Sequence, residues 1–69
     1  MIKIGSKVKW KSKGDFTEGK VLETYTEEIT KTLKGTVITR KGRKKNKALL
    51  IEQFDGTKVL KLEEEVEKV

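Results

Sequence analysis

The residues best suited to a chemical role form a basic stretch in the second half of the chain. Six of the eight residues from 40 to 47 are basic and none is acidic: Arg40, Lys41, Arg43, Lys44, Lys45 and Lys47. A loop of this composition can neutralise several phosphates, and each contact releases counterions, so affinity for a polyanion would fall steeply with salt. The stretch therefore predicts non-specific, electrostatic binding of nucleic acid. The alternatives are a solvated loop that serves solubility, or an acidic protein or membrane surface as the partner.

Alternating lysines near the start of the chain could extend this surface. Lys7, Lys9 and Lys11 would share one face of a strand, because successive side chains point to opposite sides. Residues 1–47 carry 14 basic and 5 acidic residues, a net of +9, whereas residues 48–69 carry 3 and 6, a net of −3. A polyanion should therefore meet the first part of the chain and avoid the last.

Four aromatic residues form a second candidate group: Trp10, Phe16, Tyr25 and Phe54. Some small barrels hold a methylated lysine or arginine in a cage of such rings through cation–π contact. Trp10 alternates with lysines, however, and is expected in the core, while Tyr25 is expected to cap the far end of its strand. We therefore favour structural roles. Base stacking by the few remaining rings would be limited.

No residue pattern predicts catalysis. The chain has no histidine and no cysteine, so the commonest catalytic base, the commonest metal ligand and the thiolate nucleophile are all missing. The carboxylate pairs Asp15 with Glu18 and Glu27 with Glu28 are expected to lie in water. The glutamates at 63–65 and 67 are interpreted as an acidic end that balances a basic body. We expect a protein that is not an enzyme and that holds neither metal nor cofactor.

Short strands must position these residues. A chain of 69 residues predicts one domain, residues 1–69, that buries only about 60% of its unfolded surface. Its 33% hydrophobic and 41% charged content alone would favour disorder, but the apolar residues alternate in short runs separated by glycines. No apolar run is long enough to span a membrane or to form a signal peptide. We expect a cytoplasmic monomer without a membrane partner.

The strongest strand signal is a hairpin over residues 48–62 with Asp55-Gly56 as a two-residue type I′ turn. This turn sets a register in which four apolar side chains share one core face: Leu49, Ile51, Leu60 and Leu62. A one-residue slip would scatter this set across both faces. The hairpin therefore defines the expected core.

Alternation predicts the earlier strands. Residues 7–11 form a strand with Val8 and Trp10 inward, and residues 12–15 form a turn. Residues 20–25 form the second strand, after a bulge at Gly19, with Val21 and Tyr25 on one face. Residues 1–4 could lie along a sheet edge. At the other end, the valine at position 66 is expected to reach back to the core.

Residues 26–34 fit both a helix and a strand. Threonine is a poor helix former, and the segment runs into the β-like residues 35–40, so we interpret it as a strand. Residues 41–47 are expected to form a polar loop. Short strands with glycines between them predict a small all-β barrel.

An ordered series of segments is similar to a known family. The segments are Gly5-Ser6-Lys7-Val8-Lys9-Trp10, Glu18-Gly19-Lys20-Val21, residues 29–36 with Thr39-Arg40, and residues 48–53 with Asp55-Gly56 and Val59-Leu60-Lys61. Together they resemble the hypervirulence-associated protein TUDOR domain family of small bacterial proteins. The resemblance implies an SH3-like (Tudor-like) barrel of about five strands, and it implies no activity. The family often has proline where this chain has Lys47, and an acidic loop where this chain has Arg43-Lys44-Lys45.

Two functions follow as expectations. The first is a small binding module that contacts nucleic acid through residues 40–47, with help from Lys7, Lys9 and Lys11. The alternative is a protein- or peptide-interaction barrel, because a partly open barrel leaves strand edges that can pair with an extended peptide or a second copy.

Overall fold

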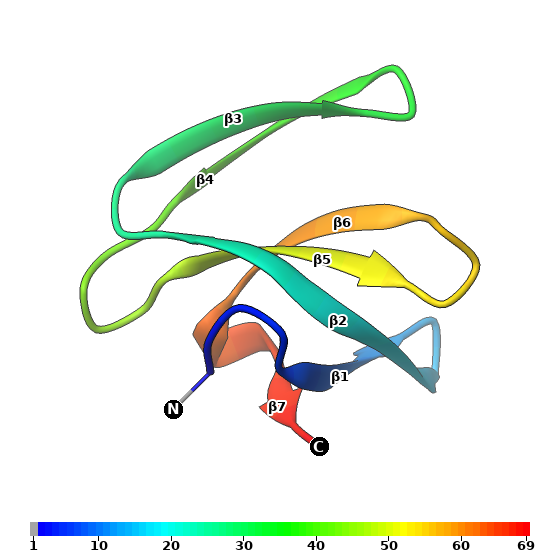
Figure 1. Ribbon diagram of the computed structural model, residues 1–69. Helices are drawn as coiled ribbons and strands as arrows, with labels where there is room; N and C mark the ends of the chain where they lie inside the picture. The colour runs from blue at the N-terminus through cyan, green and yellow to red at the C-terminus, as the bar shows by residue number, and fades with distance from the viewer. Residues whose placement is uncertain (1) are drawn as a thin grey trace.

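The computed structural model describes residues 2–69, and strands make up most of them (Figure 1). The elements are β1 (Lys7–Ser12), β2 (Asp15–Tyr25), β3 (Glu28–Leu33), β4 (Thr36–Lys41), β5 (Ala48–Gln53), β6 (Lys58–Leu62), the 3₁₀ turn η1 (Glu63–Glu65) and β7 (Glu67–Lys68). The prediction of a strand rather than a helix over residues 26–34 is confirmed by β3. The prediction of an edge segment over residues 1–4 is wrong for residues 2–4, which form no strand, and Met1 lies outside the described residues.

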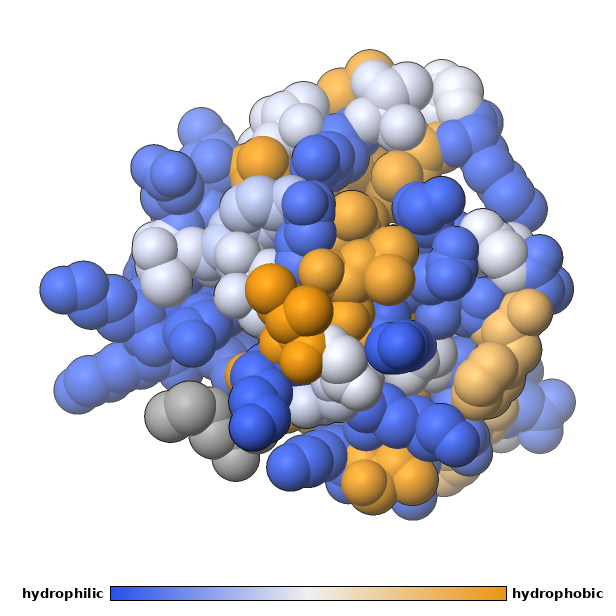
Figure 2. Space-filling model, in the orientation of Figure 1, coloured by the Kyte–Doolittle hydropathy of each residue, from blue (hydrophilic) through white to orange (hydrophobic). Residues whose placement is uncertain are grey.

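Within residues 2–69 the strands form two antiparallel sheets. One has five strands in the order β6-β5-β2-β1-β7, and the other is the β3–β4 hairpin alone. The hairpin lies over the β5–β6 end of the larger sheet and contacts β6 (Figure 1). Figure 2 shows hydrophobic side chains near the centre of the same view, with hydrophilic side chains around them. This arrangement is a small all-β, Tudor/SH3-like barrel, as the sequence predicts.

Two lysine-glycine pairs make the tightest turns. Lys13-Gly14 joins β1 to β2 with φ angles of 51° and 89°, and Lys34-Gly35 joins β3 to β4 with 51° and 76°. Positive φ at both central residues is the condition for a type I′ turn, whose twist matches that of the flanking strands. From the sequence, a type I′ turn is predicted only at Asp55-Gly56.

The predicted type I′ turn at Asp55-Gly56 is wrong. The Gly56 N–H donates to the Gln53 carbonyl (2.9 Å), and the Gln53 N–H donates to the Thr57 carbonyl (2.7 Å), so the loop has three residues. Of these three only Gly56 has a positive φ, 89°. Such a loop is a type I turn closed by a left-handed glycine. The Asp55 carboxylate accepts the Thr57 N–H (2.8 Å), which favours this form.

The longer loop moves the β5–β6 register by one residue. Leu50 pairs with Leu60, and Ile51 pairs with Val59. The four predicted core residues are thus divided: Leu49 and Ile51 lie on one face, Leu60 and Leu62 on the other. Residues 48–51 are all buried, so both faces of β5 are covered. A shift of the β5–β6 register by one residue therefore exposes no apolar side chain of β5 to solvent.

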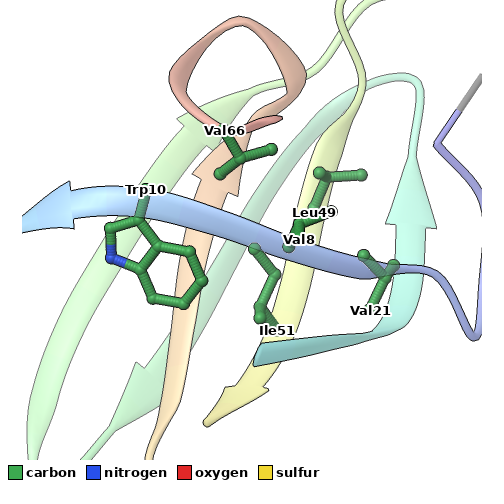
Figure 3. Close-up of a cluster of buried hydrophobic side chains, with 6 residues drawn as sticks. All are labelled: Val8, Trp10, Val21, Leu49, Ile51 and Val66. Atoms are coloured by element: carbon green, nitrogen blue, oxygen red, sulfur yellow. The ribbon is translucent and has the colours of Figure 1, made fainter. Parts of the chain in front are cut away.

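The core is formed by side chains of the five-stranded sheet, together with Val66 from the segment between η1 and β7. It consists of Val8, Trp10, Val21, Leu49, Ile51 and Val66, with Ile2 and Val59 packed against it. Figure 3 shows the six buried side chains, which come from β1, β2, β5 and the segment that follows η1. The predicted inward positions of Val8 and Trp10 and the return of Val66 are confirmed.

Strand β2 carries its bulge later than predicted. The pairing with β5 is regular at Gly19 and shifts between Val21 and Glu23. The shift places Tyr25 on the face opposite Val21, so the prediction that these two share a face is wrong. Gly19 instead permits close packing, because a Cβ there would lie 2.6 Å from Ile51 Cγ2 and 2.8 Å from the Glu52 carbonyl oxygen.

Candidate nucleic-acid interface

The basic loop, residues 40–47, includes the last two residues of β4 and turns back into β5. The expected polar loop over residues 41–47 is therefore wrong at Lys41, which still pairs with Glu28 in β3. Arg43 and Asn46 exchange two backbone hydrogen bonds, of 2.9 and 3.1 Å, so Lys44 and Lys45 occupy the tip of a tight turn. The side chains of Lys41, Arg43, Lys44 and Lys45 are exposed, whereas Arg40 and Lys47 are half-buried. The backbone therefore presents four of the six predicted cations to solvent.

Gly42 fixes the base of this loop. It is buried, and its N–H donates to the Glu27 carbonyl (3.1 Å). A Cβ at this position would overlap the Tyr25 carbonyl oxygen and lie 2.8 Å from the Ala48 nitrogen. The basic loop thus starts where three backbone segments meet, at a distance that only glycine allows.

The acidic turn, η1, packs directly against the basic loop. The Lys47 N–H donates to Glu63 Oε1 (2.8 Å), and the Glu63 N–H donates to the Lys47 carbonyl (2.9 Å). The Glu64 N–H donates to Asn46 Oδ1 (3.0 Å). From the sequence, a polyanion is expected to meet residues 1–47 and to avoid the acidic residues 48–69, as if these two parts of the chain were separate in space. The structure places them in contact.

Two open hollows flank the acidic turn. One, of about 520 Å³, is lined mainly by the basic loop; the other, of about 250 Å³, includes Lys9, Lys11 and Phe16. Glu64 lines both hollows. In the β1–β7 pairing, Lys9 also stands opposite Glu67. The two halves of the predicted basic surface therefore lie on either side of an acidic divider and do not form one continuous patch.

Arg40 forms an ion pair with the acidic turn. Its Nη2 donates to Glu65 Oε1, and its buried Nε has no hydrogen-bond partner among residues 2–69. Burial acts to raise the pKa of Glu65, but the hydrogen bonds from Arg40 and from the Leu62 N–H outweigh it and hold that pKa below its usual value. Arg40 is thus the predicted site residue least free to meet a phosphate.

This ion pair should make the free energy of unfolding depend on pH in the acidic range. Because the folded pKa of Glu65 is lowered, its contribution is present above the unfolded value of 4.5 and is lost as the pH falls through the folded value. We expect Glu65→Gln to be less stable than wild type near neutrality, by no more than about 1 kcal/mol because both side chains of the pair are still about one third accessible to solvent. Urea unfolding near neutral pH and at about pH 3 measures the difference. A gap that stays constant on acidification would contradict the role of the ion pair.

Three of the four aromatic rings lie under a lysine of the same chain. The Lys9 Nζ is 5.2 Å from the Phe16 ring centroid, Lys7 is 5.4 Å from Phe54, and Lys31 is 5.6 Å from Tyr25. Trp10 is buried in the core, as predicted, and is not available to line an exposed cage.

Phe16 and Phe54 are the surface residues that sequence reasoning undervalued. They are 62% and 74% exposed, and both lie beside the predicted β1 lysines. A type I′ turn at Lys13-Gly14 would have revealed the first, because it sets Phe16 opposite Lys11. The position of Phe54 depends on the three-residue loop, which the sequence did not predict.

Comparison with known proteins gives one match. A family model described as "Hypervirulence associated proteins TUDOR domain" matches residues 5–66. No curated protein and no solved structure matches the chain significantly. Within residues 2–69, no helix is long and apolar enough to cross a membrane.

Proposed function

Because the chain belongs to the hypervirulence-associated protein TUDOR domain family, and such small Tudor-like domains are typically binding modules, we propose that it binds nucleic acid through the basic loop. The observation that supports this is the exposure of Lys41, Arg43, Lys44 and Lys45. All of these except Lys44 line one open hollow. Within residues 2–69 none of these four takes part in an ion pair. We further propose that it acts as a single-domain monomer in the bacterial cytoplasm, without catalysis.

The loop suits phosphate groups better than base edges. Its cations stand on a short turn with long flexible side chains, which can reach several phosphates but cannot hold the fixed geometry that reads a base. The exposed Lys7 and Lys11 and the half-buried Lys9 add positive charge beyond the acidic turn. Binding is therefore electrostatic and weakly selective for sequence.

Removing three charges from the loop should abolish this binding. In the variant Arg43→Ser, Lys44→Ser, Lys45→Ser, we expect no measurable binding of a labelled duplex near physiological salt. At low salt, the slope of log K against log salt should fall by about 2 to 3. Fluorescence anisotropy over a salt series gives both quantities, and amide chemical shifts locate the contact.

A matched control removes three other exposed lysines: Lys3→Ser, Lys13→Asn and Lys34→Asn. Asparagine is chosen at 13 and 34 because it tolerates the positive φ of both positions. The control should keep most of the affinity. Equal losses in the two variants would mean that net charge, and not the basic loop, determines binding; unchanged affinity in the loop variant would overturn the proposal.

One observation favours the alternative of a protein-interaction barrel. The β3–β4 hairpin pairs with no other strand among residues 2–69, so both its outer edges are open. Val37 in β4 is also 66% exposed. Such an edge can accept an extended peptide through backbone hydrogen bonds, which salt weakens little. A partner retained at high salt would favour this function over nucleic-acid binding.

A further inference from the structure

The outer face of β1 and β2, opposite the core, combines lysines with an aromatic ring. Alternation turns Val8 and Trp10 inward, so the other β1 side chains point outward. The β1–β2 pairing then fixes their neighbours on this face: Lys11 opposite Phe16, Lys9 opposite Glu18 and Lys7 opposite Lys20. Phe54, from the β5–β6 loop, joins the same face, since Lys7 reaches its ring. We call this set the outer face.

The two rings on the outer face do little for the fold. Phe16 and Phe54 are more than half exposed, and neither belongs to the hydrophobic core. Each has an ammonium group within 5.5 Å of its centroid, Lys9 at 5.2 Å and Lys7 at 5.4 Å. Two flat apolar surfaces are thus each paired with a flexible cation.

We infer that the outer face binds single-stranded nucleic acid, with unpaired bases stacked on Phe16 and Phe54 and phosphates neutralised by Lys7, Lys9 and Lys11. This inference rests on the proposed function and specifies its substrate. A single strand carries a flat base and a charged phosphate in each nucleotide, and the outer face sets a lysine beside each of its two rings. Every base has a π-face, so such stacking tolerates any sequence. In a duplex the base faces are covered by their neighbours, so the rings gain nothing from it.

Acidic side chains limit the strength of this site. Glu18 stands opposite Lys9 in the centre of the outer face, and Glu67 flanks Lys9 from β7. Farther out, Glu52 forms an ion pair with Lys58 (3.9 Å) and stands opposite Lys20. Phosphates should therefore follow the β1 side of the face and avoid Glu18. Neutralising Glu18 should strengthen binding, a gain that a folding defect cannot produce.

The test compares two probes, a labelled oligothymidylate and a labelled blunt duplex, on wild type, Phe16→Ala, Phe54→Ala and Glu18→Gln. Each phenylalanine variant should bind the single strand about 5- to 150-fold more weakly, as expected for the loss of one stacked base, with an unchanged salt slope. Duplex affinity should not change. Glu18→Gln should bind the single strand more tightly. Val37→Ala, which also truncates an exposed apolar side chain, is the matched control and should behave as wild type.

The outcomes separate this inference from the proposed function. If the loop variant loses both probes while both phenylalanine variants keep wild-type affinity for the single strand, the outer face is not the site and the basic loop stands alone. If wild type binds neither probe, nucleic-acid binding itself is overturned. If the single strand depends on the rings but not on the basic loop, the inference stands and the loop proposal fails.

Discussion

The Gly42→Ala variant is expected to lose about 3 kcal/mol of its free energy of unfolding. The added Cβ would overlap the Tyr25 carbonyl oxygen and press on the Ala48 nitrogen, and both are backbone atoms that no side-chain rotation can relieve. Overpacking usually costs about 1 to 3 kcal/mol, and a clash with fixed backbone lies at the upper end. A chain of 69 residues has only about 3 to 10 kcal/mol in total. The loss is therefore about a third or more of the total free energy of unfolding, and at the lower end of that range many Gly42→Ala molecules should be unfolded without denaturant.

Urea unfolding followed by Trp10 fluorescence measures this loss. Gly35→Ala provides the control, because Gly35 has a positive φ of 76° but nothing within 4 Å of the added Cβ. It should cost only about 1 kcal/mol, the strain of a non-glycine residue in that conformation. If Gly35→Ala were the less stable of the two, the packing at the base of the basic loop would not be as tight as the structure shows.

Replacing Leu49 with alanine is expected to cost about 2 to 5 kcal/mol, because Leu49 is fully buried and the cavity cannot collapse within a sheet. Leu62 is the informative comparison. In the register predicted from the sequence the two leucines are equivalent partners on one core face. In the structure Leu49 pairs with Lys61, while the half-buried Leu62 pairs with Ala48 on the other face. Leu62→Ala should therefore cost clearly less.

Calorimetric or urea unfolding of both leucine variants decides between the two registers. Equal losses at positions 49 and 62 would support a two-residue loop at Asp55-Gly56. If Leu62→Ala is more stable than Leu49→Ala by more than about 1 kcal/mol, the three-residue loop is supported, because the cost of truncating a side chain increases with its burial. Both variants keep the turn residues unchanged, so the turn itself is not disturbed.

The predictability of the fold from the sequence follows the pattern of burial. Val8 and Trp10 were placed correctly because β1 has one buried and one exposed face, which gives a clean alternation. The β5–β6 register was missed because residues 48–51 are buried on both faces and carry no such alternation. Turn type was missed for a related reason: the aspartate before Gly56 suits a type I turn as well as its mirror image.

The candidate site was predictable where it is local in sequence. The basic loop is a continuous run of residues, so its content needs no structural information. The docking of the acidic turn was missed, because the hydrogen bonds between Lys47 and Glu63 continue the β5–β6 pairing, and the predicted register set Lys47 opposite Glu64 instead. The prediction that the β1 lysines extend the basic surface is modified by the same docking, which inserts Glu64 between the two hollows.

The pairing of β7 with β1 bears on the order in which this chain folds. Val8 pairs with Lys68, so two residues near opposite ends of the chain must meet before the strand forms. Closing such a long loop costs more entropy than closing any of the three hairpins, and contacts that are distant in sequence form slowly. The acidic turn follows β6 directly, and the hydrogen bonds between Glu63 and Lys47 continue the β5–β6 pairing, so we expect it to reach its place with that hairpin, before β7 closes. During folding, the glutamates of η1 should therefore meet the basic loop before the two ends of the chain come together.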